Sequence, residues 1–412
     1  MSVATQDPTA APKPTPSGNG LGDYARRWWI DVRSGDLGSL PIIVGLIVIA
    51  IVFQTANSNF LTAGNFVNLI IQSAAYALVA MGIVFVLLLG EIDLSVGYVS
   101  GVAGVLVSLF LTPDGNVMPA FLAVVLSLLA GLAIGVFQGG IVTKIGIPSF
   151  VVTLAGLLGW NGVVLLLIGS RGTVILQNNF VIGLANNFMS DALSWILVVA
   201  VTAAYGAVLL ARMRSRAKLG LPNEPFVLVG LRVGLLFVIL AIVTAVANQD
   251  RGIPWVGVIV GAFLVFWTFV LNRTRFGRHI YAVGGNQEAA RRAGINVDRI
   301  KMACFALCSF MAAVGGVVLA SRLRSVDTSA GGGQILLYSI AAAVIGGTSL
   351  FGGRGNMKSA ILGALVIGSI DNGLGLLGLS AGTKFVVTGA VLLLAVAVDS
   401  ISRKGRAQSG RA

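Results

Sequence analysis

Residues 69–89 read Leu-Ile-Ile-Gln-Ser-Ala-Ala-Tyr-Ala-Leu-Val-Ala-Met-Gly-Ile-Val-Phe-Val-Leu-Leu-Leu, a run without a charged side chain. A helix needs about 20 such residues to cross a bilayer. The whole chain of 412 residues is 56% apolar and only 10% charged, whereas soluble domains carry about 25% charged residues. This composition excludes an ordinary soluble enzyme, a disordered chain and a nucleic-acid-binding domain, and it predicts a membrane protein.

Further apolar runs follow this one along the chain. The sequence therefore predicts an all-α polytopic membrane protein with about twelve transmembrane helices, within a range of about ten to fourteen. The predicted spans are 40–53, 69–89, 94–111, 118–137, 150–168, 193–210, 227–246, 253–271, 302–320, 335–348, 360–379 and 385–398.

The basic residues predict the orientation. With the N-terminus inside, 23 of the 28 Lys and Arg residues fall in cytoplasmic segments, as expected where basic loops face anionic membrane lipid. An even number of spans then places both termini in the cytoplasm. Residues 1–38 are predicted to form a disordered N-terminal tail and an interfacial segment, 39–400 the transmembrane domain, and 401–412 a cytoplasmic C-terminal tail.

The longest cytoplasmic loop, residues 273–301, contains a predicted short helix over 287–293. Glu288 lies in its first turn, where a negative charge suits the helix dipole, and Gly294 ends it. A helix this short is not stable alone in water. It is therefore expected to dock in a groove of a soluble partner, and the alternative is a solvated basic loop.

This loop resembles the coupling loop of ABC-transporter permeases, in which Glu-Ala-Ala is followed by three residues and Gly, as at 288–294 here. Residues 276–286 are similar to the version found in ribose- and xylose-type sugar permeases. Segments 59–65, 147–154 and 345–355 resemble other parts of that family. The resemblance implies that the following residues couple the chain to an ATPase subunit: Gly277, Arg278, Ala282, Gly284, Asn286, Glu288, Ala289, Ala290 and Gly294.

A second segment matches the family with one departure. Residues 90–97 read Gly-Glu-Ile-Asp-Leu-Ser-Val-Gly, where the family usually has Gly in place of Glu91. Glu91, Asp93, Ser95 and Gly97 form a predicted membrane-edge motif, in which Asp93 is expected to cap the following span.

Two polar residues, Asp371 and Asn372, interrupt an otherwise apolar predicted span. A carboxylate at membrane depth is costly unless it is paired or faces water. These residues either line the translocation pathway or form a hydrogen-bonded structural group near a helix break at the following glycines.

The resemblance implies the permease subunit of an ATP-driven importer for a monosaccharide, namely xylose or another pentose, in a bacterial inner membrane. The pair of spans around 212–272 looks like the insertion of the longer, xylose-type members. The implied partners are an ABC ATPase, an extracytoplasmic sugar-binding protein and a second copy of the permease. The sequence shows no Gly-x-x-x-x-Gly-Lys-Ser/Thr motif, so the chain is not expected to bind ATP phosphates in that way. It also shows no paired acids, metal cluster or nucleophile–base set, so no enzyme activity, catalytic residue, cofactor or metal is expected. The alternative is an ion-coupled secondary transporter.

Overall fold

The structure is a computed structural model that describes residues 22, 40–112, 118–221 and 223–408. The predicted tail at 1–38 therefore lies outside the described residues, apart from residue 22. The chain divides into two compact units. Among the described residues, the first contains Trp195–Val243, and the second contains residues 40–194 and 244–408.

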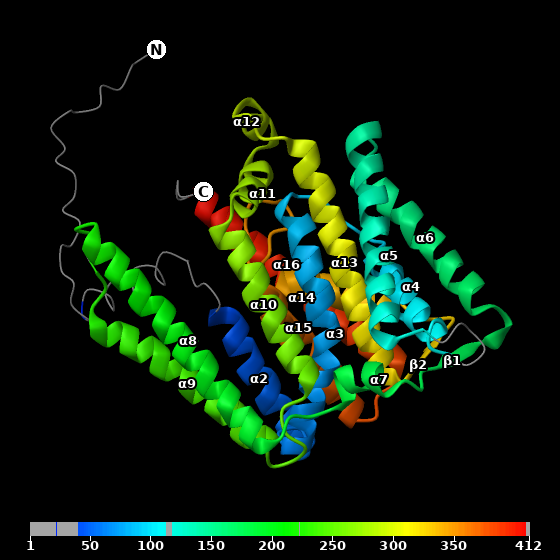
Figure 1. The fold of residues 1–412 in the computed structure, drawn as a ribbon, viewed down its shortest axis with the longest axis horizontal. Coiled ribbons are helices and arrows are strands. Elements are labelled where there is room, and N and C mark those ends of the chain that lie inside the picture. The colour runs from blue at the N-terminus through cyan, green and yellow to red at the C-terminus, as the bar shows by residue number, and fades with distance from the viewer. Residues whose placement is uncertain (1–21, 23–39, 113–117, 222, 409–412) are drawn as a thin grey trace. The chain divides into compact units, whose positions relative to one another are not determined.

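Helices make up most of the second unit (Figure 1). They are α2 (Leu40–Ala56), α3 (Ala63–Leu88), α4 (Val96–Leu109), α5 (Ala120–Gly140), α6 (Ser149–Ile168), α7 (Asn179–Asn186), α10 (Trp255–Arg273), α11 (Arg275–Gly285), α12 (Gln287–Arg292), α13 (Val297–Leu323), α14 (Gly333–Ile345), α15 (Met357–Leu376) and α16 (Ala381–Gln408). A π-helical turn, Ile141–Ile145, extends α5, and a 3-10 turn, Gly169–Arg171, follows α6.

Two short strands pair across the chain. β1 (Thr173–Ile175) and β2 (Ser325–Asp327) run antiparallel, with Val174 opposite Val326. They join the segment after α6 to the segment after α13.

The first unit holds most of two long helices, α8 (Asp191–Lys218) and α9 (Phe226–Ala247). The first residues of α8, before Trp195, and the last residues of α9, after Val243, belong to the second unit. Arg232 pairs with Glu224 at 2.7 Å within it. The expected insertion covers residues 212–272, whereas the separate unit covers Trp195–Val243. α10 therefore belongs to the second unit and not to the separate one. Buried Trp267 and Leu271 fix α10 in that core.

A helix coincides with each of the twelve predicted spans. Among the described residues, eight helices are long and apolar enough to cross a membrane, while α2, α4 and α14 are shorter apolar helices. The prediction of an all-α polytopic membrane protein is confirmed, and the number of spans stays a prediction. α16 runs on to Gln408, beyond the predicted end of the last span.

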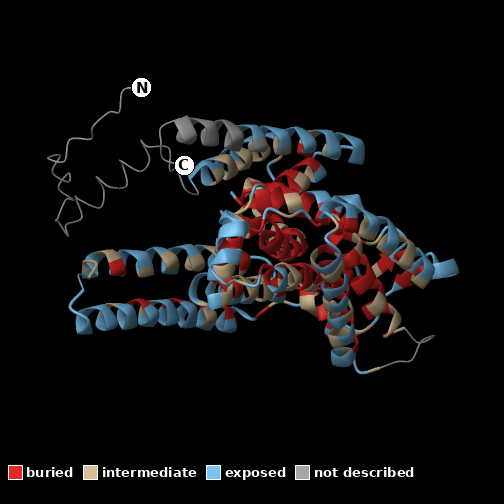
Figure 2. Cartoon of the chain, turned by 90° about the horizontal axis from the view of Figure 1, so that it is seen from above, coloured by how far each residue is buried: buried red, intermediate tan, exposed pale blue. Residues whose placement is uncertain are grey.

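The core of the second unit forms around α3 and α13, which pack on each other. α13 also packs on α4 and α5, and α3 packs on α14 and α15. Figure 2 shows buried residues gathered in the interior of the unit. In the most apolar part of α3, 83% of the residues are buried, whereas the share is 22% in α6. Glycine permits the closest approach between helix backbones in this core. A Cβ at Gly316 of α13 would overlap the backbone carbonyl of Ser100 in α4. Small residues of this kind allow two helix backbones to come close together.

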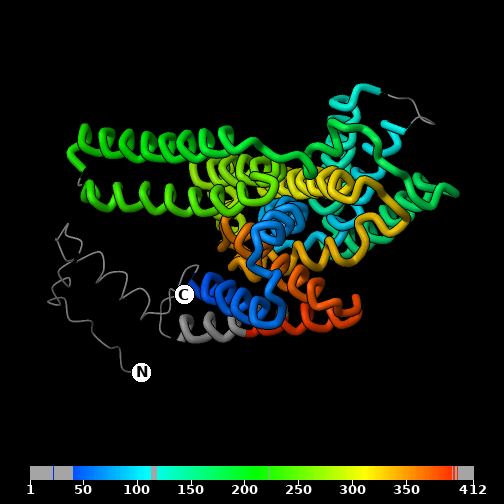
Figure 3. Tube along the Cα trace, turned by 90° about the horizontal axis from the view of Figure 1, so that it is seen from below, coloured from blue at the N-terminus to red at the C-terminus, as the bar shows by residue number. Residues whose placement is uncertain are grey.

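A smaller core lies on α15. Val366, Ile370 and Leu374 are buried there against side chains of α2 and α16. The first and last helices of this unit therefore meet the same neighbour, and Figure 3 shows them on the same side of the unit.

Candidate functional site

The predicted cytoplasmic loop folds as two helices, α11 and α12, joined at Asn286. Thr274 begins α11, since its Oγ1 accepts a hydrogen bond from Gly277 N at 3.2 Å. Asn286 begins α12 in the same way, since its Oδ1 accepts from Ala289 N at 2.9 Å. Short polar side chains at these positions satisfy N–H groups that have no partner within the helix. The helix predicted from residue 287 is confirmed, whereas α11 was not predicted.

Gly294 ends the shorter helix as predicted. Its φ is +81°, a left-handed conformation that glycine adopts without steric cost. Gly294 N donates to Arg291 O at 3.0 Å, and Ile295 N donates to Ala290 O at 3.1 Å. These bonds satisfy carbonyls at the end of the helix and turn the chain towards α13.

The proposed coupling residues divide into an exposed and an anchored set. Gly277 and Ala290 are buried, and Gly284 is half-buried. The exposed set comprises Arg278, Ala282, Asn286, Glu288, Ala289 and Gly294. The α11–α12 element is thus held on the unit by small residues while it presents polar and small side chains outward.

The glycine-rich segment 345–355 lies against this element. Tyr281 OH donates to Gly355 O at 2.8 Å. Burial raises the pKa of Tyr281 above its ordinary value, so the hydroxyl keeps the proton that it donates. Gly353 N donates to Leu88 O at 2.8 Å, and a Cβ at Gly284 would overlap the same carbonyl. Three segments far apart in the sequence therefore meet at the end of α3.

Glu91, the residue that departs from the family pattern, forms an ion pair. Lys301 Nζ lies 2.6 Å from Glu91 Oε1, and Ser149 Oγ donates to Glu91 Oε2 at 2.5 Å. The side chains of Lys301 and Glu91 are only 13% and 18% exposed. The pair joins the α3–α4 loop to the first turns of α13, directly after the coupling element. Sequence reasoning identified neither Lys301 nor Ser149 as a partner.

A cavity of about 290 Å³ opens beside this ion pair. Its lining brings together Gln287 and Arg291 of α12 with Glu91, Asp298 and Lys301. Two acids and two bases, Glu91, Asp298, Arg291 and Lys301, thus line one hollow next to α12.

The remaining residues of the membrane-edge motif are buried. Asp93 Oδ1 accepts from Ser95 N at 2.9 Å and lies 2.6 Å from Ser95 Oγ. The expected capping role needs correction, because α4 begins at Val96 with Ser95 as its N-cap residue and without a side-chain capping bond. Asp93 instead fixes the residue before the helix. Gly97 lets the chain at Gly331 come close, because a Cβ added at Gly97 would lie only 2.7 Å from the carbonyl oxygen of Gly331.

Asp371 and Asn372 both have partners. Asn372 is buried and exchanges two hydrogen bonds with Asn65, at 2.8 and 2.9 Å, and donates to Gln72 Oε1 at 3.1 Å. Asp371 is half-buried, 3.9 Å from Lys384 Nζ. No helix break follows them, since α15 continues through both glycines to Leu376. A Cβ at Gly373 would overlap the ring of Phe53, so that glycine serves packing with α2.

The fold defines a polytopic membrane protein with a two-helix element, α11–α12, between two of its apolar helices. The family described as "Branched-chain amino acid transport system / permease component" matches residues 65–396. The chain belongs to this family. Its members are permease components of ABC importers, so ATP hydrolysis takes place on partner subunits and the chain is not itself an enzyme. It is a multi-pass protein of the bacterial inner membrane.

Individual relatives are similar over nearly the full chain. The xylose transport system permease protein XylH of Escherichia coli K12 is 36% identical over 90% of this chain and 94% of its own length. XylH of Haemophilus influenzae is 35% identical over 89% of this chain and 98% of its own length. The ribose import permease protein RbsC of E. coli K12 is 31% identical over 92% of this chain and 96% of its own length. No solved structure matches the chain significantly.

Proposed function

We propose that this chain forms the translocation pathway of a binding-protein-dependent ABC importer for a pentose, with xylose as the first substrate to test. The observation that carries the proposal is the α11–α12 element, in which Ala290 is buried while Glu288 and Ala289 are exposed. Such an element can transmit motion because one face is fixed to the core and the other is free for an ATPase subunit. Relatives named for xylose reach 36% identity and those named for ribose reach 33%, which favours xylose.

The proposed assembly is a permease homodimer with two ATPase subunits on the cytoplasmic side and a sugar-binding protein outside. Twelve spans, with both termini in the cytoplasm, agree with the distribution of basic residues. Residues 39–400 then form the permease domain, 1–38 and 401–412 the tails, and the basic loops face membrane lipid. Alternating access arises as ATP and the binding protein favour different states of the dimer.

Within this assembly, Asp371 belongs to the polar face of the pathway. Its carboxylate is half-buried and reaches only one cation, Lys384, at 3.9 Å among the described residues. A charge in this setting is better accommodated facing a water-filled passage than facing lipid. Asn372 serves beside it as a structural amide bound to Asn65.

Reconstitution tests the function directly. The permease is co-expressed with its ABC ATPase and sugar-binding protein, purified in mild detergent and placed in proteoliposomes. We expect the ATPase to co-purify, and xylose-loaded binding protein to stimulate ATP hydrolysis and ATP-dependent xylose uptake. The controls are ribose, leucine and an ATPase subunit unable to hydrolyse ATP.

The outcomes separate the alternatives. Accumulation of solute by the permease alone on a proton or sodium gradient would establish a secondary transporter instead. Uptake of leucine without uptake of any pentose would contradict the sugar assignment while leaving the ABC permease intact.

A further inference from the structure

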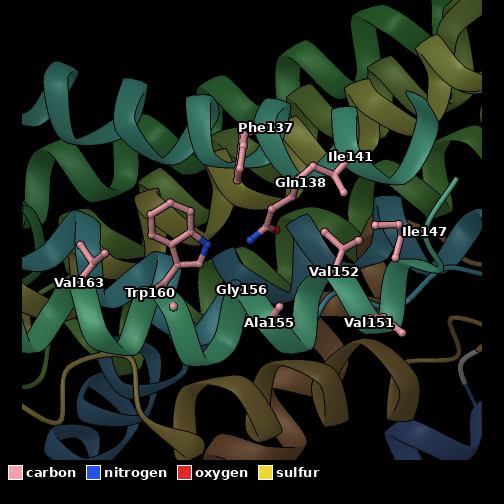
Figure 4. A pocket seen from close by; sticks show the side chains of 11 residues that line it. Phe137, Gln138, Ile141, Ile147, Val151, Val152, Ala155, Gly156, Trp160 and Val163 are labelled. Atoms are coloured by element: carbon pink, nitrogen blue, oxygen red, sulfur yellow. The ribbon is translucent and has the colours of Figure 1, made fainter. Parts of the chain in front are cut away.

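A cavity of about 450 Å³ lies between α5 and α6 (Figure 4). This volume falls within the range of about 300–1,000 Å³ that is common for small-molecule sites. The eleven described residues that line it include no charged side chain. A charged ligand would lose its hydration there without compensation, so the cavity suits a neutral one.

Two polar groups in this cavity lack protein partners. Gln138 is only 2% exposed, and its Nε2 has no hydrogen-bond partner among the described residues. The buried indole Nε1 of Trp160 has none there either. Figure 4 shows both side chains in the cavity, with their nitrogen atoms turned towards the space between them. Leaving such buried groups unpaired is unfavourable, and a ligand with hydroxyl groups would remove that cost.

Ser95 holds the oxygen end of the Gln138 amide in place. Ser95 Oγ lies 2.9 Å from Gln138 Oε1 and 2.6 Å from Asp93 Oδ1. A Cβ at Gly156 would overlap the amide nitrogen, so the glycine leaves space for this side chain. One end of the amide is therefore occupied by Ser95, and the other end stays available to a ligand in the cavity.

The walls suit the rest of a sugar molecule. Phe137 and Trp160 supply aromatic surface, and Val152 and Val163 supply aliphatic surface. The C–H faces of a sugar ring can pack on such surfaces while its hydroxyls bind polar groups. A lipid acyl chain would fill the cavity but would leave Gln138 Nε2 and Trp160 Nε1 without a hydrogen-bond partner.

We infer that this cavity binds a neutral sugar of pentose size through the Gln138 amide and the Trp160 indole, as a subsite of the translocation pathway. The inference rests on the proposed function and adds the residues that contact the substrate. It also gives the buried Asp93–Ser95 pair a positioning role, because Ser95 orients the amide.

Protection from alkylation tests the site in the permease–ATPase complex in lipid nanodiscs. Gly159 lines the cavity and has room for a Cβ, and Gly162, on the same helix, also has room but does not line it. Gly159→Cys and Gly162→Cys are each made in a background with Cys304→Ala and Cys308→Ala. We expect xylose to slow the reaction of N-ethylmaleimide at position 159, to leave position 162 unchanged, and leucine to protect neither. Adding Gln138→Met should weaken protection by xylose about five- to tenfold, the effect of one lost hydrogen bond.

A parallel uptake assay separates this inference from the proposed function. If the unmodified importer takes up xylose but xylose never protects position 159, the cavity is not the sugar site. Equal protection by leucine, or protection that Gln138→Met leaves unchanged, would also overturn the assignment. If the unmodified importer takes up no pentose, the proposed function itself fails, whatever the alkylation shows.

Discussion

At the scale of single residues, Gly294 sets the end of α12, the proposed coupling helix. Its φ of +81° costs a residue with a Cβ about 1–2 kcal/mol. Gly294→Val, which adds a β-branched side chain, is therefore expected to disorder the end of α12 and to reduce sugar-stimulated ATP hydrolysis and uptake. The measurement is uptake in proteoliposomes normalised to inserted permease.

Gly294→Asn provides the matched control. Asparagine tolerates the left-handed conformation better than other non-glycine residues, and nothing lies within 4 Å of a Cβ at this position. We expect the asparagine variant to keep most of its uptake. Normal coupling in the valine variant would show that the conformation of Gly294 is not needed.

The ion pair between Glu91 and Lys301 is a second feature of single residues. Removing one partner by Glu91→Gln or Lys301→Met leaves a charge that is mostly buried, which should lower stability by about 1–3 kcal/mol. Each single variant is expected to lower the apparent melting temperature and the uptake rate. The reversed pair, Glu91→Lys with Lys301→Glu, should recover part of both, because it restores opposite charges.

Glu224→Gln is the control for this pair. It removes the exposed Arg232–Glu224 pair, and exposed pairs contribute only about 0–1 kcal/mol. Its melting temperature should therefore stay close to that of the unmodified chain. Reversed charges that are no better than either single variant would argue against a direct role for the pair.

At the scale of elements, α11 holds the coupling region on the membrane unit. Its buried residues, Gly277, Ile280 and Val283, recur every three positions, a helical spacing that sequence analysis did not use. Gly284→Val would place a side chain against the Leu88 carbonyl. We expect this variant to insert normally but to lose coupling between ATP hydrolysis and uptake.

The neighbouring Gly285 supplies a control in the same helix. Nothing lies within 4 Å of a Cβ at Gly285, so Gly285→Val should keep its coupling. Equal losses in both variants would mean that helix propensity, and not the contact with α3, explains the effect.

The end of α15 offers a second test at this scale. Asp371→Cys, without the two native cysteines, is expected to react with a small water-soluble thiol reagent at a rate that changes with ATP and binding protein. Asn372→Cys should react more slowly, because position 372 is buried beside Asn65. If both positions stay unreactive in every state while uptake is normal, the pathway does not pass Asp371.

At the scale of the whole molecule, the orientation in the membrane can be tested on the two sides of α6. Lys144 and Arg171 are both exposed and flank this helix. In the background without native cysteines, Lys144→Cys should react with an impermeant reagent only from the cytoplasm and Arg171→Cys only from outside. Labelling of both from one side would contradict the proposed topology.

The sequence by itself determined the class of protein and the position of its helices. Long apolar runs are a local property, since a bilayer requires about 20 such residues whatever the rest of the chain does. The end of α12 was likewise predictable, because one glycine takes a conformation that other residues resist. α11 was missed because its apolar stripe, Gly277, Ile280 and Val283, is short and lies within a basic loop.

Only the tertiary structure decided which residues meet. Lys301 and Glu91 are 210 positions apart, and Asn372 and Asn65 are 307 positions apart. The cavity with Gln138 and Trp160 also depends on how α5 and α6 pack. No local preference encodes such pairs, because they form only when packed helices bring distant segments together and buried polar groups must find partners.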